Sequence, residues 1–285
     1  MVRLSHTLFG LPFCLAATLL AHRHMTTAGG EGVTGFKLVL IVLAFTGARS
    51  AAMGFNRIAD RDIDAANPRT AQREIPAGTI KLSSAWIFTL ASAGLFVGAA
   101  AALGRLPLIL SPLCLFVVFG YSLFKRFSWA AHLFLGLALA LAPGGAWVAI
   151  TGSIEAWPIP TVLMGAVASW VAGFDVIYSL QDEHYDRDVG LHSIPVRFGT
   201  TGALVISGLL HLITIACLVG LHLMAQMSWL HAAGVSLIGV ILIYEHWIVR
   251  PNDLSRIGKA FFDLNGWISI AYLACTLGDL MWLQA

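Results

Sequence analysis

The sequence predicts an all-α polytopic membrane protein, and three observations support this fold class. The chain has 285 residues, of which 58% are apolar and only 11% are charged, whereas soluble domains carry roughly 25% charged residues. Apolar runs of about 20 residues recur along the whole length, and each is long enough to cross a bilayer. No polar stretch is long enough for a soluble domain, so residues 1–285 are predicted to form a single transmembrane domain.

Nine apolar runs are the candidate spans. In chain order they cover residues 5–22, 36–56, 83–103, 106–124, 130–151, 160–181, 201–222, 228–248 and 261–282. At 1.5 Å per residue, a helix of about 20 residues crosses roughly 30 Å of hydrocarbon. The first run is similar to a signal peptide, but no small-x-small cleavage site follows it, so we interpret it as the first span. The third and fourth runs are separated only by Gly104 and Arg105.

The lysines and arginines predict the orientation of the spans, because cytoplasmic loops carry an excess of positive charge. With the N-terminus in the cytoplasm, thirteen of the 17 lie on that side, three lie on the opposite side, and Arg49 lies inside a span. This bias places the charged stretches 49–78 and 175–199 at the cytoplasmic face. The expected location is a bacterial inner membrane. The lipid bilayer is the expected partner, and no nucleic-acid partner is expected.

A weak internal repeat relates the second span to the sixth. The second leads into Asp60, Asp64, Ile75-Pro76 and Gly78, and the sixth leads into Asp182, Asp186, Ile194-Pro195 and Gly199. Because four spans separate the two, the repeat predicts two related four-helix units plus one helix, with about nine transmembrane helices around a central cavity.

Four polar residues fall on one face of the second span and its extension. With 100° per residue and Asn56 as origin, Asp60 lies at about 40°, Asp64 at about 80° and Arg49 at about 20°. This alignment assumes that one continuous helix runs through all four residues. Asn56-x-x-x-Asp60-x-x-x-Asp64 is called the first acidic motif below.

The sixth span has a similar polar face. With Asp175 as origin, Asp182 lies at about −20°, Asp186 at about +20° and Tyr178 at about −60°. Tyr178-x-x-x-Asp182-x-x-x-Asp186 is called the second acidic motif. Both motifs are predicted to lie at the same membrane surface.

Carboxylates crowded at one surface repel one another, which raises their pKa values unless a cation neutralises them. Mg²⁺ typically binds one or two carboxylates, several waters and the phosphate oxygens of a substrate. Arginines and lysines flank both motifs, and such side chains bind the remaining oxygens of a diphosphate. Solvation or helix capping would account for any single acid, but two one-face motifs favour a metal-bridged diphosphate site.

These residues resemble a known family. The first and second acidic motifs are similar to the two aspartate-rich motifs of the UbiA family of intramembrane aromatic prenyltransferases, and Tyr121-x-x-x-Lys125 resembles the Tyr/Lys element between them. Arg69-Thr70-x-x-Arg73 followed by Pro76-x-Gly78 is similar to the 4-hydroxybenzoate polyprenyltransferase branch. The resemblance covers nearly the whole chain.

The resemblance implies Mg²⁺-dependent transfer of a polyprenyl chain from polyprenyl diphosphate to a small aromatic acceptor, in the biosynthesis of a membrane quinone. It implies metal–diphosphate binding by Asn56, Asp60, Asp64, Asp182 and Asp186, and diphosphate contacts from Arg61, Arg69, Lys125 and Arg126. The candidate catalytic residues are Tyr121, Lys125, Asp175 and Asp182. Loops 64–82 and 186–200, rich in Pro, Gly and charge, are candidate caps over the site.

Arg49 and Asp175 are predicted to lie inside spans, where charged side chains are costly and usually functional. We interpret Arg49 as a ligand of an acceptor carboxylate or of the diphosphate, with a structural ion pair to Asp175 as the alternative. Asp175 is expected to orient the acceptor or to assist proton removal after attack.

Two further alternatives stay open at this point. The acceptor is a 4-hydroxybenzoate-like acid, as in ubiquinone biosynthesis, or a dihydroxynaphthoate on the futalosine route to menaquinone. An alternative of another class is a transporter with an acidic central site, since transporters also combine intramembrane acids, repeats and a central cavity. A transporter does not require two one-face acidic motifs at a single surface.

Overall fold

The computed structural model describes residues 4–154 and 156–283, and over these ranges the protein consists of helices and loops without a strand. The helices are α1 (Leu4–Thr27), α2 (Gly35–Ala59), α3 (Arg61–Ala66), α4 (Leu82–Leu103), α5 (Arg105–Phe124), α6 (Ala131–Thr151), α7 (Pro158–Ser179), α8 (Glu183–Asp188), α9 (Ile194–Met224), α10 (Trp229–Ile248), α11 (Ile257–Lys259) and α12 (Asn265–Gly278). Short helical turns of other pitch cover Leu180–Asp182, Ala260–Leu264 and Asp279–Leu283. The all-α fold class is confirmed.

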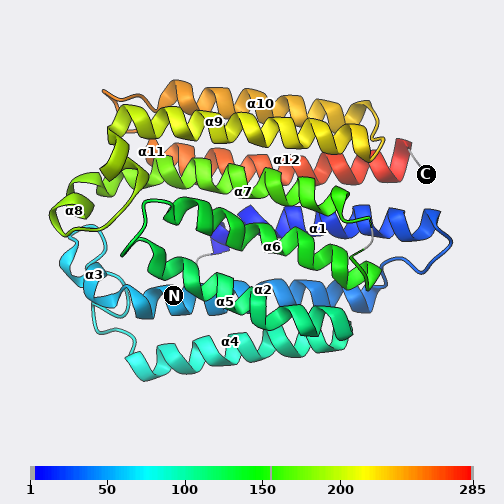
Figure 1. The fold of residues 1–285 in the computed structure, drawn as a ribbon, viewed down its shortest axis with the longest axis horizontal. Helices are drawn as coiled ribbons and strands as arrows, with labels where there is room; N and C mark the ends of the chain where they lie inside the picture. The colour runs from blue at the N-terminus through cyan, green and yellow to red at the C-terminus, as the bar shows by residue number, and fades with distance from the viewer. Residues whose placement is uncertain (1–3, 155, 284–285) are drawn as a thin grey trace.

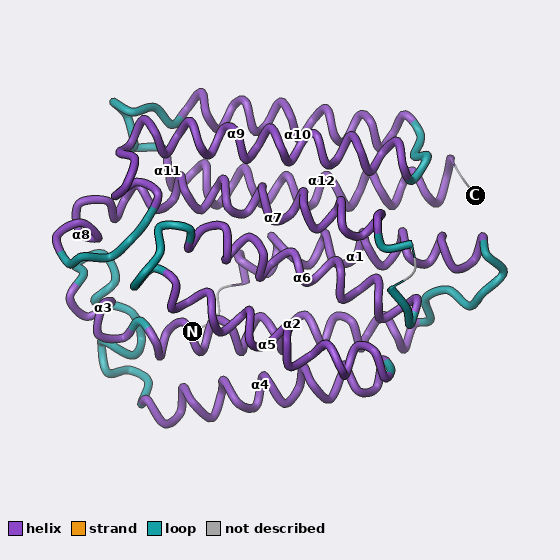
Figure 2. The backbone as a smooth tube through the Cα atoms, in the orientation of Figure 1, coloured by secondary structure: helices purple, strands orange, loops and turns teal. Residues whose placement is uncertain are grey.

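The long helices lie side by side in one bundle (Figure 1). α2 packs mainly against α4, α7 packs against α6 and α9, and α1 packs against α6 and α12. The short helices α3, α8 and α11 gather with their loops at one end of the bundle, which is on the left in Figures 1 and 2. This end, marked by α3 and α8, is called the loop end below.

Eight segments of the described residues are long and apolar enough to cross a membrane. They contain α2, α4, α5, α6, α7, α9, α10 and α12, and they correspond to the second to ninth predicted spans. α1 is a further helix of 24 residues at the place of the first predicted span. The protein is therefore an integral membrane protein, while the count of nine spans and the division into two four-helix units stay predictions.

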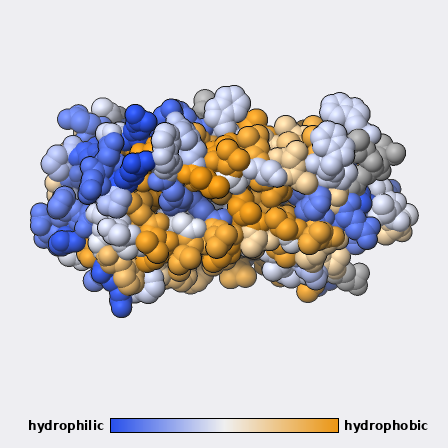
Figure 3. All heavy atoms as spheres, turned by 90° about the horizontal axis from the view of Figure 1, so that it is seen from above, coloured by the Kyte–Doolittle hydropathy of each residue, from blue (hydrophilic) through white to orange (hydrophobic). Residues whose placement is uncertain are grey.

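The outer surface matches a bilayer. Ile87 on α4, Phe116 on α5 and Trp247 on α10 are all more than half exposed, at 69%, 75% and 60%. Apolar atoms cover the middle of the face seen in Figure 3, and hydrophilic atoms concentrate at its left, the loop end. Exposed apolar side chains on helices of this length are expected to contact lipid.

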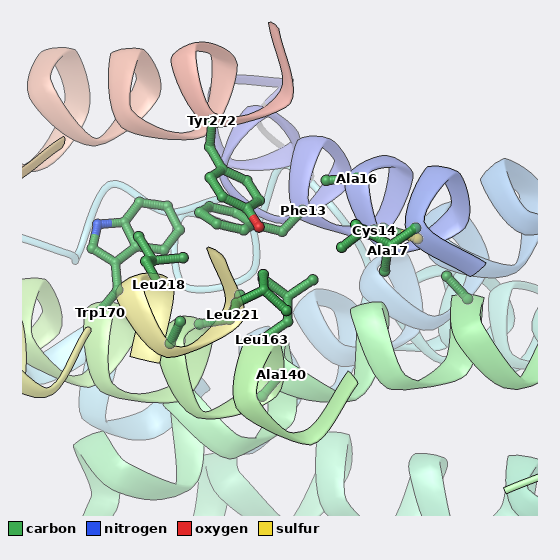
Figure 4. Packing of buried hydrophobic residues seen from close by; sticks show 14 of the residues in the cluster. Phe13, Cys14, Ala16, Ala17, Ala140, Leu163, Trp170, Leu218, Leu221 and Tyr272 are labelled. Carbon is green, nitrogen blue, oxygen red and sulfur yellow. The ribbon is translucent and has the colours of Figure 1, made fainter. Parts of the chain in front are cut away.

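The core joins α1 to the second half of the chain. Phe13 on α1 stacks on Tyr272 of α12 with ring centroids 4.8 Å apart, and Trp170 of α7 lies 5.1 Å from Phe13 (Figure 4). Trp170 Nε1 donates to Asn265 Oδ1 at 2.7 Å, which satisfies both buried groups. This packing fixes α7, the helix that carries Asp175.

α6 and α7 approach each other closely at Gly136. A Cβ atom at this position would lie 2.2 Å from the carbonyl oxygen of Ala168, so the spacing requires glycine. One turn earlier on α6, His132 lies directly against Asp175 of α7. The close helix packing therefore shapes one wall of the cavity described next.

Candidate active site

A cavity of about 590 Å³ lies at the loop end of the bundle. Its walls come from α2, α3, α5, α6, α7 and α8. The sequence-predicted site residues among its lining are Arg49, Asn56, Asp60, Asp64, Arg69, Tyr121, Lys125, Asp175, Asp182 and Asp186. The structure thus brings both acidic motifs and the Tyr/Lys element to one cavity.

The helix of the first acidic motif bends at Asp60. α2 ends at Ala59 and α3 begins at Arg61, because the backbone of Asp60 (φ −92°, ψ 3°) departs from helical geometry. The continuous helix predicted from the sequence is therefore wrong. Asp60 N–H still donates to Asn56 O at 2.9 Å, and Asp64 N–H donates to Asp60 O at 2.7 Å. These bonds keep all three motif residues on the cavity side.

Asp60 is buried, with 2% exposure, and is neutralised by the cations that follow α5. Lys125 Nζ lies 2.7 Å from Asp60 Oδ2, and Arg126 Nη2 lies 3.4 Å from Oδ1. Asn56 Nδ2 also donates to Oδ2, at 3.0 Å. The Tyr/Lys element therefore meets the first acidic motif directly.

Asp64 is equally buried, with 3% exposure. Arg73 Nη1 donates to its Oδ1 at 2.7 Å, and Arg57 Nη1 lies 4.0 Å from Oδ2. Within the described residues, Oδ2 accepts no hydrogen bond although it is buried. A buried carboxylate oxygen without a hydrogen-bond donor favours a cationic ligand, because a buried polar atom that lacks a partner is costly.

The helix of the second acidic motif changes pitch before its acids. α7 ends at Ser179, a 3₁₀ turn follows, and α8 begins at Glu183. Arg69 Nε donates to Asp182 Oδ1 at 2.8 Å, and Asn67 Nδ2 donates to the same oxygen at 3.2 Å. Both donors lie in the loop after α3, so this loop covers the cavity and joins the first motif to the second.

Asp186 lies on α8, near the end of the candidate span Pro158–Asp188. Its carboxyl lines the cavity together with that of Asp182. Two carboxylates at one site repel each other unless a cation lies between them. The electrostatics of the second motif therefore fit a divalent cation.

Arg49 and Tyr121 form the floor of the cavity. Together with Leu139 they also line a second, apolar pocket of about 160 Å³, so the two spaces meet here. Arg49 Nε is buried and has no hydrogen-bond partner in the part of the chain that the structure describes. The alternative pairing with Asp175 is not observed there, because Asp175 pairs with His132 instead. A buried guanidinium with an open donor suits an anionic ligand.

His132 is a cavity residue that the sequence analysis did not single out. Its Nδ1 lies 2.7 Å from Asp175 Oδ2, and Ile194 N–H donates to its Nε2 at 3.4 Å. In the sequence His132 is one of ten histidines and stands outside every motif. Only the packing of α6 on α7 reveals this pair.

Arg57 and Asn67 also line the cavity and were not predicted as ligands. Arg57 directly follows Asn56, so its place beside the first motif was a usable signal. Arg61 is not among the cavity-lining residues described. Its Nη1 donates to Ile58 O at 3.3 Å and its Nη2 lies 3.2 Å from Asp62, because the bend at Asp60 turns it toward solvent. The structure therefore does not support Arg61 as a diphosphate contact.

No three His, Cys, Asp or Glu side chains among the described residues are gathered tightly enough to hold a metal alone. Asp60, Asp64 and Asp182 are each paired with a lysine or arginine instead. The donor set nevertheless consists of carboxylate and amide oxygens, which Mg²⁺ prefers, and Asp64 Oδ2 is open. These residues fit Mg²⁺ that is shared with phosphate oxygens of a ligand.

Comparison of the sequence with known proteins identified relatives of this chain. Residues 11–268 match the family model of the UbiA prenyltransferase family. The 4-hydroxybenzoate octaprenyltransferase of Idiomarina loihiensis is 31% identical over 245 residues, which cover 85% of this chain and 85% of that protein. The protein of the same name from Vibrio parahaemolyticus is 30% identical and covers 80% of this chain and 79% of its own.

Solved structures agree with this relationship. The apo structure of a UbiA homologue from Aeropyrum pernix is 33% identical, covers 99% of this chain and 100% of its own, and superposes with a TM-score of 0.88. A UbiA homologue from Archaeoglobus fulgidus, solved with DMAPP and Mg²⁺, has the same fold at 22% identity, with a TM-score of 0.68 over 98% of each chain. Because the family model spans most of the chain and both acidic motifs meet in one cavity, the chain belongs to the UbiA prenyltransferase family.

Proposed function

We propose that the protein transfers a polyprenyl chain from polyprenyl diphosphate to a small aromatic carboxylic acid of the 4-hydroxybenzoate kind, with Mg²⁺ as cofactor. One observation carries this proposal. Two acidic motifs and five Lys and Arg side chains line one cavity, and its floor meets an apolar pocket. The relatives named 4-hydroxybenzoate octaprenyltransferase, at about 30% identity, support the same acceptor class.

The diphosphate binds at the mouth of the cavity. Lys125, Arg69 and Arg73 each pair with one motif acid, and the same three cations supply donors for the diphosphate oxygens. The magnesium ligands are Asn56, Asp60, Asp64, Asp182 and Asp186. When bound, Mg²⁺ supplies Lewis-acid stabilisation of the diphosphate leaving group.

The side chains around the diphosphate act as its allylic carbon–oxygen bond breaks. The electron pair stays on the diphosphate, and Lys125 and Arg69 stabilise the growing negative charge. Tyr121, at the floor, presents an aromatic face to the allylic cation. The loop after α3 excludes water, which would otherwise capture this cation. In the membrane, the loop end faces the cytoplasm, as the distribution of lysines and arginines indicates.

The isoprenoid tail and the acceptor occupy different parts of the interior. The tail enters the apolar pocket, whose walls include the small residues Ala48, Ala142 and Gly145. The acceptor lies near the floor of the cavity, where its carboxylate pairs with Arg49. Its ring is then within reach of Asp175, which orients it and assists removal of the ring proton.

The test is a prenyl-transfer assay on the purified protein with Mg²⁺, farnesyl diphosphate and a panel of aromatic acids. Prenylated 4-hydroxybenzoate supports the proposal, and EDTA is expected to abolish the product. A product formed only with a dihydroxynaphthoate assigns the acceptor to the menaquinone alternative. If no aromatic acid is prenylated and no diphosphate is released, the enzyme proposal fails and the transporter alternative gains support.

A further inference from the structure

His132 and Asp175 form a pair at the wall of the cavity, and neither residue belongs to an acidic motif. His132 Nδ1 lies 2.7 Å from Asp175 Oδ2, and the two side chains are 6% and 22% exposed. Gly136, one turn along α6, permits the close approach of α7 on which the pair depends. The position of the imidazole is therefore fixed by helix packing.

The second ring nitrogen identifies the tautomer. Ile194 N–H donates to His132 Nε2 at 3.4 Å. A ring nitrogen that accepts a hydrogen bond carries no proton, so the neutral ring holds its proton on Nδ1 and donates it to Asp175. Ile194 is itself held at the start of α9, where Val196 N–H donates to Ser193 Oγ at 3.3 Å.

Asp175 differs from the other acids of the cavity in its partner. Asp60, Asp64 and Asp182 are each paired with a lysine or arginine, whereas Asp175 pairs with a neutral imidazole. Among the described residues, its Oδ2 takes the hydrogen bond and its Oδ1 has none, while the side chain lines the cavity. Oδ1 is therefore left to contact a ligand in the cavity.

We infer that His132 is a positioning residue, which holds Asp175 Oδ2 so that Oδ1 serves as the base for the ring proton of the acceptor. The inference rests on the proposed function and deepens it. It assigns a role to His132, which belongs to neither acidic motif, and it separates the acceptor-side acid from the four metal-side acids.

The proton balance of the transfer follows from this arrangement. The carbon–oxygen bond of the donor breaks with its electron pair on the diphosphate. A ring electron pair of the acceptor then forms the new carbon–carbon bond, which leaves the ring positively charged with one hydrogen too many. Asp175 Oδ1 takes this proton, the carbon–hydrogen electron pair returns to the ring, and aromaticity is restored. Asp175 then passes the proton to water at the cavity mouth.

The test compares His132→Ala, His132→Gln and His132→Asn, using an acceptor deuterated at the ring position that is attacked. Asn places an amide donor near the position of Nδ1 and keeps the bond to Asp175, whereas Gln and Ala lose it. His132→Ala and His132→Gln are expected to lower kcat roughly 10- to 100-fold, as for the loss of a group that supports general base catalysis. The KM for the prenyl diphosphate should stay close to that of the wild type.

The isotope effect distinguishes positioning from general damage. In His132→Gln, proton removal becomes slower, so the primary isotope effect on kcat is expected to exceed that of the wild type. His132→Asn should restore both kcat and the isotope effect to wild-type values. Equal losses of kcat in the His132→Asn and His132→Gln proteins, or an unchanged isotope effect, would overturn the inference. The proposed function would still stand in that case if the wild type shows transfer activity. If the wild type prenylates no aromatic acid, both fail. Since Gln and Asn fill the space, the comparison holds even if His132→Ala does not fold.

Discussion

Arg69 and Asp182, which are 113 residues apart, meet across the mouth of the cavity, where Arg69 Nε donates to Asp182 Oδ1 at 2.8 Å. The pair holds the loop after α3 against the second acidic motif. Under the proposed function, Arg69 would contact the diphosphate and Asp182 would help to hold Mg²⁺, so this pair lies where the donor and the metal would bind.

Removal of the Arg69 side chain should weaken donor binding. A hydrogen bond to a charged group contributes about 1.5–3 kcal/mol, so Arg69→Ala is expected to raise the KM for polyprenyl diphosphate roughly 10- to 100-fold. Arg69→Lys keeps the charge but not the two-nitrogen fork of the guanidinium. Its KM for polyprenyl diphosphate should lie between those of the wild type and Arg69→Ala. Arg61→Ala is the matched control, because Arg61 faces Asp62 outside the cavity. A similar KM in the Arg69→Ala and Arg61→Ala proteins would contradict the assignment.

Loss of a motif carboxylate should affect magnesium dependence as well as rate. Asp60→Asn and Asp182→Asn are each expected to lower kcat/KM by at least about 100-fold, which corresponds to roughly 2.7 kcal/mol of transition-state stabilisation. The Mg²⁺ concentration for half-maximal rate should rise in both. Asp62→Asn serves as control, because this acid is 82% exposed on α3 and points away from the site. Full activity in either motif variant would refute the metal assignment.

Arg49 should determine affinity for the acceptor carboxylate. Arg49→Ala is expected to raise the acceptor KM by roughly 10-fold or more, the effect of losing one charged hydrogen-bond partner, without a comparable change in donor KM. The control is chemical: the same assay with a phenol that lacks the carboxylate, for which wild type and variant should not differ. An unchanged acceptor KM combined with weaker donor binding would move Arg49 to the diphosphate.

The apolar pocket should limit the length of the prenyl chain. No atom lies within 4 Å of a Cβ built on Gly145, so Gly145→Phe fills the pocket without a clash at the backbone. This variant is expected to keep activity with geranyl diphosphate and to lose it progressively with longer donors. Gly94→Phe is the matched control, because Gly94 is exposed on α4 and its Cβ position is also open. The measurement is kcat/KM for donors of increasing chain length. If kcat/KM changed with chain length in the same way for both variants, the pocket would not limit chain length.

The positions of the two acidic motifs were predictable because helical periodicity is local. Steps of four residues, such as Asn56 to Asp60, keep side chains on one face whether or not the helix bends. The bend itself was not predictable, since Asp60 has neither the ring of proline nor the freedom of glycine. At the bend, Lys125 Nζ donates to Asp60 Oδ2 at 2.7 Å, a contact between segments 65 residues apart that local sequence does not specify.

The pairing partners of the charged residues were likewise not predictable from the sequence. Arg61 and Arg69 look equivalent as basic residues after the first motif, yet only Arg69 reaches Asp182. The choice depends on where the bend directs α3. His132 and Asp175 show the same limit, because their contact requires the α6–α7 spacing that Gly136 permits.

Residues 192–194, at the start of α9, form hydrogen bonds to both the Tyr/Lys element and His132. His192 N–H donates to Lys125 O at 2.8 Å, and Ile194 N–H donates to His132 Nε2. These two bonds join the backbone of the Tyr/Lys element to the imidazole that pairs with Asp175. A change in the backbone of residues 192–194 would therefore displace both.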